Sequence, residues 1–222
     1  MKQYCFINES IKYMKKKLSI TEIQNLIIDK EKFIFTPLDL QRYFNVSYDI
    51  ARVFISRNVK KGLYTKIKRG VYFDKKFAPN EFEIANRLYE PSYVSFEYAL
   101  MYYNIIPEMV YTITSATTKA TREFSVNNII YSYSRFKKKY FTGYIKKDIG
   151  GRSVYVAEPE KALVDYLYFV SLGKKALNDR IDLKKIDYKK LIYFSKIFKR
   201  KSLDRLIKQT YDESNTNQEI IY

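Results

Sequence analysis

The spacing of apolar residues changes along the chain, and each spacing favours a different kind of element. Apolar residues recur every three or four positions from residue 19 to residue 59, which is typical of amphipathic helices. Three helices are expected there, over about residues 20–30, 37–44 and 48–59. The stretch KKGLYTKIKRGVYFD, residues 60–74, instead alternates apolar and polar residues around Arg69-Gly70. This alternation with a central turn predicts a β-hairpin.

The expected helices are separated by short, well-defined signals. Thr36 precedes Pro37, a pair typical of a helix start because proline lacks the N–H that the first turn leaves unused. Asn45-Val46 interrupts the apolar pattern, and Ser47 can cap the next helix. A two-residue break sets two helices at a steep angle, as in a helix-turn-helix. Three helices followed by a basic hairpin therefore predict a winged helix-turn-helix domain.

The third helix is the expected recognition helix, whose N-terminal part enters the major groove of DNA. We expect Ile50, Val53 and Phe54 to face the core and a polar side to face outward. The candidate base-reading residues are Ser47, Tyr48, Asp49, Arg52 and Ser56. The candidate phosphate contacts on this helix and the hairpin are Arg57, Lys60, Lys61, Lys66, Lys68 and Arg69. The alternative interpretations are a solvated helix face and an edge strand protected by lysines.

The pattern restarts around residues 78–80, and we expect a domain boundary there. The following region mixes short helices with strands rich in β-branched residues, and hairpins are expected at Asn127-Asn128 and Gly150-Gly151. The predicted fold class is α+β. It comprises a winged helix-turn-helix domain over residues 19–76 and a C-terminal α/β domain of short strands and helices over residues 77–211. Residues 1–18 are expected to be a flexible basic leader and residues 212–222 a tail.

The charge of the chain indicates a polyanionic partner. Lys and Arg outnumber Asp and Glu by 41 to 24, a formal net charge of +17, which favours nucleic acid or an anionic membrane surface. Residues 1–76 hold 17 Lys and Arg against 7 Asp and Glu, a net charge of +10, so the excess is concentrated in the predicted DNA-binding part. A generally lysine-rich proteome is the alternative explanation. No apolar run reaches the roughly 20 residues of a membrane helix, so we expect a cytoplasmic protein without a membrane partner.

The residue types that are missing exclude several kinds of chemistry. The chain has no His and only one Cys, Cys5, so an imidazole base, a His or Cys zinc site and an intrachain disulfide are excluded. We expect no catalytic residue, no metal and no cofactor. The segment EPEK, residues 158–161, and Asp165 place carboxylates beside a lysine as metal nucleases do, but their position at a helix start favours a structural role. Tyr131, Tyr133 and Tyr140 are weaker candidates for stacking on bases.

Three stretches taken together resemble one known protein family. They are GLYTKIKRGVYF (residues 62–73), YVSFEYALMYYNIIPEMVYTITSATTKATREF (93–124) and VYVAEPEKALVDYLYF (154–169). Over about residues 19–211 the chain resembles the AbiEi family, the antitoxins of type IV toxin–antitoxin and abortive-infection systems. The resemblance implies a two-domain bacterial protein whose winged helix binds repeats in its own promoter and represses the operon. It also implies a C-terminal domain that supports antitoxicity, and it brings no catalytic residues.

The expected function is therefore that of a DNA-binding autorepressor and antitoxin in phage defence. Its partners would be double-stranded DNA carrying the promoter repeats and a nucleotidyltransferase-like toxin, encoded nearby and counteracted without a stable complex. The chain would act as a monomer or weak dimer that could bind DNA cooperatively. Two alternatives are a stand-alone winged-helix regulator and an interaction protein that directly sequesters a toxin. A carboxylate-dependent enzyme acting on nucleic acid is a third.

Overall fold

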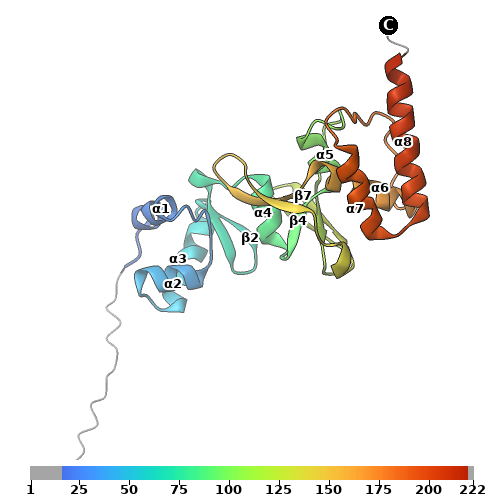
Figure 1. Ribbon diagram of the computed structural model, residues 1–222. Coiled ribbons are helices and arrows are strands. Elements are labelled where there is room, and N and C mark those ends of the chain that lie inside the picture. Colours follow the sequence, from blue (N-terminus) through green and yellow to red (C-terminus); the bar gives the residue numbers. More distant parts are fainter. Residues whose placement is uncertain (1–16, 220–222) are drawn as a thin grey trace, which may run out of the picture. The chain divides into compact units, whose positions relative to one another are not determined.

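The computed structural model describes residues 17–219, without the side chains of residues 213–219. Within this range the chain forms eight α-helices and two β-sheets, a mixed α/β architecture (Figure 1). The chain divides into two compact units between Pro79 and Asn80, close to the boundary expected at residue 77. Most of the expected leader, residues 1–16, lies outside the described residues.

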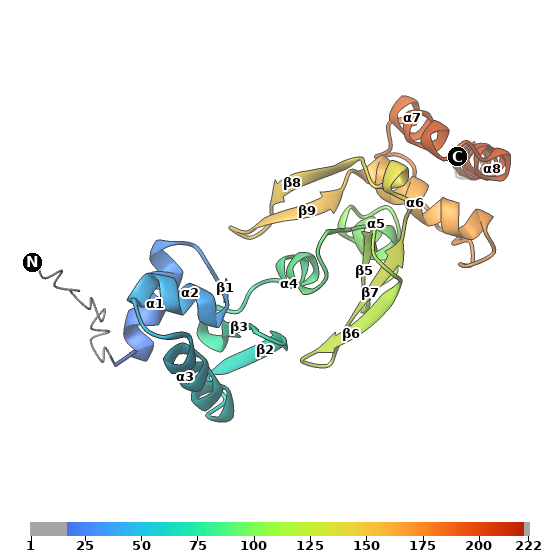
Figure 2. The ribbon, with the colours of Figure 1, turned by 90° about the horizontal axis from the view of Figure 1, so that it is seen from below.

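The first unit combines three helices with a small antiparallel sheet (Figure 2). The strand order is β1-β3-β2, and a single 3₁₀ turn, η1, follows the last strand. The three helices and the hairpin confirm the predicted elements, whereas β1 is too short to show a period in the sequence. The elements are α1 (Ile20–Asp29), β1 (Ile34–Phe35), α2 (Pro37–Phe44), α3 (Tyr48–Lys60), β2 (Tyr64–Lys68), β3 (Val71–Asp74) and η1 (Lys75–Phe77).

The break between α2 and α3 is built by local hydrogen bonds. At the start of α2, Thr36 and Asp39 form a capping box, in which each side chain accepts the other residue's backbone N–H. The helix ends at Asn45, whose φ of 50° is the left-handed conformation that asparagine tolerates well. The hydroxyl of Ser47 then accepts the N–H of Ile50 at 3.3 Å and starts α3. The predicted break is confirmed.

The buried side of α3 differs from the predicted one. The helix buries Ala51, Ile55 and Asn58, whereas the side chains of Ile50 and Val53 are each 40% exposed. The residues that are buried follow the helical spacing of four and three positions, but a small alanine and a polar asparagine conceal that pattern in the sequence. The core cluster of the first unit consists of Leu18, Ile23, Ile27, Phe35, Leu40, Val46, Ala51, Ile55 and Tyr64.

This core corrects two further expectations in the first unit. Leu18 is buried, so the expected leader does not extend to residue 18. In the hairpin, Tyr64 packs into the core while its neighbour Leu63 is 40% exposed. Burial therefore departs from the expected strict alternation at the start of β2, because Tyr64 and Thr65 are both buried. The strand begins at Tyr64, and the preceding Gly62, with a φ of 74°, belongs to the turn.

The second unit is built on one six-stranded mixed sheet with the order β6-β7-β5-β4-β9-β8. Strands β4 and β9 are parallel, as are β5 and β7, and the other neighbours are antiparallel. Its strands are β4 (Ser92–Val94), β5 (Ile113–Thr117), β6 (Arg122–Val126), β7 (Ile129–Arg135), β8 (Tyr144–Asp148) and β9 (Ser153–Ala157). Its helices are α4 (Glu81–Leu88), α5 (Phe96–Tyr102), α6 (Pro159–Ser171), α7 (Tyr188–Phe198) and α8 (Lys201–Glu219), with a 3₁₀ turn η2 (Lys138–Tyr140).

The two hairpins predicted in the second unit are confirmed. Asn127 and Asn128 both have positive φ, 49° and 64°, and they join β6 to β7. Gly150 and Gly151 lie in the turn between β8 and β9. Helices α6, α7 and α8 pack against one another (Figure 1). The expected tail is wrong for residues 212–219, because α8 continues to Glu219.

Candidate nucleic-acid interface

Helix α3 is held to the first unit along one side and is exposed along the other. Asn58 is buried, its side-chain amide donates to the carbonyl of Phe54 at 2.9 Å, and its own carbonyl accepts the N–H of Leu63 at 3.0 Å. The latter bond ties the end of α3 to the residue that enters the hairpin. The buried Asn58 thus satisfies its own side-chain amide within α3, and its backbone carbonyl links the helix to the hairpin; the sequence pattern did not single out this residue.

Four of the five predicted base-reading residues are exposed on α3. They are Tyr48, Asp49, Arg52 and Ser56, and the fifth residue, Ser47, uses its hydroxyl to cap the helix. The Arg52 Nη2 atom lies 3.3 Å from the Asp49 Oδ1 atom, as expected for an acid that orients the guanidinium. In helical projection the side opposite Ala51 and Ile55 is centred near Asp49 and Val53. The exposed face of α3 therefore presents polar and charged groups around one apolar side chain.

Val53 belongs to this exposed face, although the sequence pattern placed it in the core. It is flanked along the helix by Asp49, one turn before it, and by Arg57, one turn after it. A small apolar side chain at such a position can contact the methyl group of thymine, the one apolar feature of the major groove. Ala51 is the sequence signal that could have placed Val53 on the exposed face. Because α3 buries only one side, burial of the side that carries Ala51 leaves the side that carries Val53 exposed.

The basic hairpin follows α3 directly, and α3 packs against β2. Lys66 and Arg69 are exposed and Lys68 is half-buried, while the register of β2 against β3 shifts between Lys66 and Lys68. Gly70 has a φ of 77°, a conformation that glycine adopts without strain, so it allows the tight turn. The candidate phosphate contacts of the hairpin thus lie at its tip and along β2.

The cations of this unit are largely free of carboxylate partners. Among residues 17–212, whose side chains the structure describes, no carboxylate forms an ion pair with Arg57, Lys60, Lys61, Lys66 or Arg69. Lys32 differs, because its ammonium group contacts Asp39 Oδ1 at 2.5 Å. Unpaired cations can neutralise phosphates without first breaking an internal ion pair. The exposed cations at the end of α3 and on the hairpin are thus available to a polyanion.

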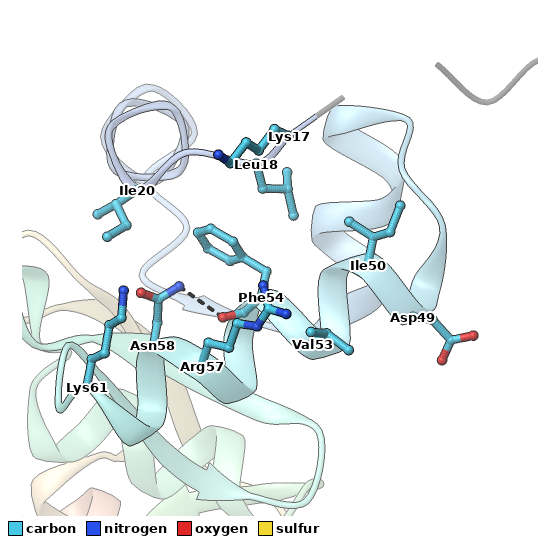
Figure 3. A pocket seen from close by; sticks show the side chains of 10 residues that line it. All are labelled: Lys17, Leu18, Ile20, Asp49, Ile50, Val53, Phe54, Arg57, Asn58 and Lys61. Carbon is cyan, nitrogen blue, oxygen red and sulfur yellow. Dashed lines mark hydrogen bonds between the residues drawn. The ribbon is translucent and has the colours of Figure 1, made fainter. Parts of the chain in front are cut away.

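A hollow of about 640 Å³ lies between α3 and the segment that leads into α1 (Figure 3). Its wall includes Ile50, Phe54 and Arg57 on α3 and Lys61 directly after the helix, and Leu18 faces it from the other side. Figure 3 shows the side chain of Asp49 pointing away from the hollow. Two predicted phosphate contacts, Arg57 and Lys61, therefore lie beside apolar side chains.

The carboxylates and lysine of the EPEK segment are occupied within the second unit. Lys161 and Asp165 are fully buried and form an ion pair, and Asp165 Oδ2 also accepts the hydroxyls of Tyr93 at 3.0 Å and Ser95 at 2.8 Å. Burial lowers the pKa of Lys161 and raises the pKa of Asp165, and their mutual attraction opposes both shifts. Glu160 accepts the N–H of Asp187 at 3.1 Å. The described residues contain no group of three His, Cys, Asp or Glu side chains that could hold a metal.

The stacking role considered for three tyrosines is wrong. Tyr131 and Tyr133 are 0% exposed and Tyr140 is 8% exposed, so their ring faces are not available to bases. Tyr133 donates its hydroxyl to the carbonyl of Ala85 at 2.6 Å, and burial raises its pKa. The tyrosines that alternate along β7 lie on its buried side. Sequence composition alone did not distinguish this arrangement from an exposed row of aromatic side chains.

Comparisons with known proteins leave the chain without an assigned family. No model of a known protein family matches it, and no curated protein is significantly similar to it. Across residues 17–219, none of the helices combines the length and the apolar character that spanning a membrane requires.

Proposed function

We propose that the chain is a DNA-binding transcriptional autorepressor whose first unit is a winged helix-turn-helix domain. Helix α3 would lie in the major groove, and the hairpin β2–β3 would contact phosphates beside it. This geometry matches the way in which such domains place a recognition helix. The protein would act in the bacterial cytoplasm on operator repeats in its own promoter.

The observation that carries this proposal is the exposed face of α3. Arg52, with Asp49 at 3.3 Å, is exposed on a helix that packs against the core through Ala51 and Ile55. Arginine donating two hydrogen bonds to guanine is the commonest specific contact in the major groove. The exposed cations Lys60, Lys61, Lys66 and Arg69 that follow add the sequence-independent attraction to phosphates on which such binding rests.

We further propose that the protein acts as the antitoxin of a type IV toxin–antitoxin system. This part rests on the resemblance to AbiEi antitoxins over about residues 19–211 and on the separation of the chain into two units. The second unit would support antitoxicity against a nucleotidyltransferase-like toxin encoded nearby. No stable complex between the two proteins is expected.

The direct test is binding to the promoter region of the chain's own gene. Fluorescence anisotropy with that duplex and with a shuffled duplex of equal length should show preferential binding to the promoter. Equal affinity for both duplexes would contradict the autorepressor. For the antitoxin, the adjacent reading frame is expressed with and without this chain, and restored growth is expected. Isolation of a stable complex with that product would favour direct sequestration instead.

A further inference from the structure

A second cationic site lies in the second unit, away from α3 in the sequence. It is a cavity of about 380 Å³ between the end of β7 and the C-terminal end of α6. Three exposed cations line it, Arg135, Lys137 and Lys174, and no acidic side chain is among its lining residues. No carboxylate on the described side chains, residues 17–212, forms an ion pair with any of these three. The cavity is therefore electropositive and is not neutralised by the protein itself.

The strand topology places these cations where ligands often bind. Arg135 is the last residue of β7 and pairs with Thr117, the last residue of the parallel neighbour β5. The chain then continues into the cavity wall, held by the Phe136 N–H bond to the carbonyl of Thr117 at 2.7 Å. In open α/β sheets, ligands bind beyond the carboxyl ends of parallel strands. Arg135 and Lys137 are thus fixed to a rigid edge of the sheet.

The opposite wall is aromatic and carries an unused hydroxyl. Tyr168 on α6 is half-buried, and its hydroxyl makes no hydrogen bond within the described residues. Burial raises the pKa of Tyr168, and the nearby cations Arg200 and Lys139 partly oppose the shift. The hydroxyl therefore stays protonated at neutral pH and can donate a hydrogen bond. The Tyr168 ring is held against Phe198, with 4.4 Å between ring centroids.

Arg200 partly covers the C-terminal end of α6, where backbone carbonyl groups would otherwise repel an anion. Arg200 donates from Nε to the Ser171 hydroxyl at 3.0 Å and from Nη2 to the Ser171 carbonyl at 2.9 Å. A cation at this end of a helix offsets the partial negative charge of its last carbonyls. Arg200 therefore lowers the cost of bringing a negatively charged group near Tyr168.

We propose that this cavity binds one nucleotide of a single-stranded nucleic acid. Arg135, Lys137 and Lys174 would contact the phosphate groups, and the base would pack beside Tyr168. The volume lies within the range of about 300–1,000 Å³ that is typical of ligand pockets and admits a single nucleotide rather than a duplex. Proteins that bind single strands combine cationic grooves with aromatic side chains in this way, because an unpaired base can leave its stack.

The test uses the full-length protein and short fluorescent octamers of uridine and of thymidine, which distinguish RNA from DNA. The variant Arg135→Gln/Lys137→Gln should bind the preferred octamer about tenfold more weakly. Tyr168→Leu should weaken binding without a change in charge. The matched control Lys184→Gln/Lys185→Gln removes two exposed lysines of the same unit, and it should retain binding within about twofold because neither residue lines the cavity.

Cross-linking provides a readout that does not depend on the variants folding. With 5-iodouridine octamers and the unaltered protein, the cross-linked peptide should contain Tyr168. Equal losses in both double variants would show diffuse attraction and would overturn the proposal. Cross-links confined to residues 17–79 would also overturn it, as would binding of anionic phospholipid vesicles but not of octamers. Binding of promoter duplex to the same variants separates this result from the function proposed for α3.

Discussion

Arg52 and Asp49 lie one turn apart on α3, and the Arg52 Nη2 atom is 3.3 Å from the Asp49 Oδ1 atom. Their side chains are 61% and 79% exposed, and ion pairs as exposed as this contribute little to the stability of a fold. We expect the pair instead to favour the side-chain orientations of Arg52 that keep this contact, before any ligand binds. A guanidinium that is already oriented loses less conformational entropy on contacting a base.

We expect the substitution Arg52→Ala to weaken binding to promoter DNA more than binding to random DNA. The expected loss of discrimination is about 1–3 kcal/mol, the contribution of one arginine that donates two hydrogen bonds to guanine. The measurement is a pair of anisotropy titrations, with promoter duplex and shuffled duplex at one salt concentration. An unchanged ratio of the two affinities would remove Arg52 from base recognition.

Lys66→Ala is the matched substitution on the hairpin, where an exposed lysine is expected to contact a phosphate. Phosphates are present in every sequence, so promoter and shuffled DNA should lose affinity about equally. The slope of log affinity against log salt should become shallower by about one unit. If Lys66→Ala instead impairs only promoter binding, the hairpin reads bases or local DNA shape.

The unaltered protein should bind duplex DNA with a strong dependence on salt. Five cations, Arg57, Lys60, Lys61, Lys66 and Arg69, form no ion pair with the carboxylates of residues 17–212. If they neutralise about five phosphates, the slope of log affinity against log salt should be roughly −4 to −5. Titrations at several salt concentrations between about 50 and 200 mM measure this slope. A flat dependence would contradict electrostatic binding by this unit.

The capping box of α2 should make the first unit sensitive to acid. Asp39 accepts hydrogen bonds from the Lys32 ammonium at 2.5 Å and from the Thr36 backbone N–H at 2.7 Å. Burial raises the pKa of Asp39, but the bonds from Lys32 and Thr36 outweigh burial and hold it below the ordinary value of 3.8. A carboxyl group whose pKa is lower in the folded than in the unfolded state stabilises the fold at pH values above its unfolded-state pKa. This contribution is lost as the pH falls through the folded-state pKa.

The variant Asp39→Asn keeps the shape of the side chain and removes its charge. At about pH 6 it should unfold with about 1–2 kcal/mol less free energy than the unaltered protein. That difference should shrink at about pH 2.5, below the ordinary value of 3.8, because the unaltered protein loses the contribution of the Asp39 charge as the pH falls. Urea denaturation followed by circular dichroism at both pH values gives the comparison. A difference that is equal at the two pH values would exclude a charged Asp39 as the source.

A glycine beside the buried ion pair should be sensitive to substitution for reasons of packing. A Cβ added to Gly143 would lie 2.6 Å from a ring carbon of Phe194 and 2.9 Å from side-chain carbons of Lys161. Gly150 also has positive φ, 61° against 75° for Gly143, but a Cβ there would meet no atom within 4 Å. Both alanine variants therefore carry backbone strain, and only Gly143→Ala adds a steric clash.

Gly143→Ala should consequently lower the free energy of unfolding by about 1–3 kcal/mol more than Gly150→Ala does. Denaturation curves of the two variants, recorded under the same conditions, measure this difference. Similar destabilisation by both variants would mean that Phe194 and Lys161 move aside at little cost.

Elements that are set by neighbouring residues are predictable from this sequence. Thr36-Pro37 marks the start of α2, and Asn127-Asn128 marks a hairpin turn, because both signals act within a few residues. The phase of α3 is not predictable in the same way, since Ala51 and Asn58 are buried by contacts with other elements. Ile50 and Val53 carry the stronger apolar signal but remain exposed.

The buried network of the second unit is also not predictable from residues that are close together in the sequence. Asp165 is bonded by Tyr93 and Ser95, residues that lie about 70 positions earlier in the chain. A lysine and an aspartate four positions apart normally suggest an exposed helical pair. Only the packing of α6 against the sheet and α7 shows that Lys161 and Asp165 are inside. Likewise, α6 forms one wall of the cavity beside Arg135, and the strands β8 and β9 separate it from β7 in the sequence.

Repression and antitoxicity should be separable, because the chain forms two units with cores of their own. Arg52 is exposed, and exposed substitutions usually change stability by no more than about half a kcal/mol. Arg52→Ala should therefore lose promoter repression and still protect cells when it is expressed from a foreign promoter. Leu163→Asp should do the reverse, because Leu163 is 0% exposed and an unpaired charge at its position is costly.

A promoter-reporter assay and a growth-rescue assay, run on the same two variants, measure the two activities. Circular dichroism establishes that Arg52→Ala is folded, and duplex binding establishes that the first unit of Leu163→Asp is intact. Leu163→Ile keeps an apolar side chain of similar volume, so it should retain both activities and serves as the control. If folded Arg52→Ala loses both activities, DNA binding is itself the antitoxic act. The second unit would then act through DNA binding rather than beside it.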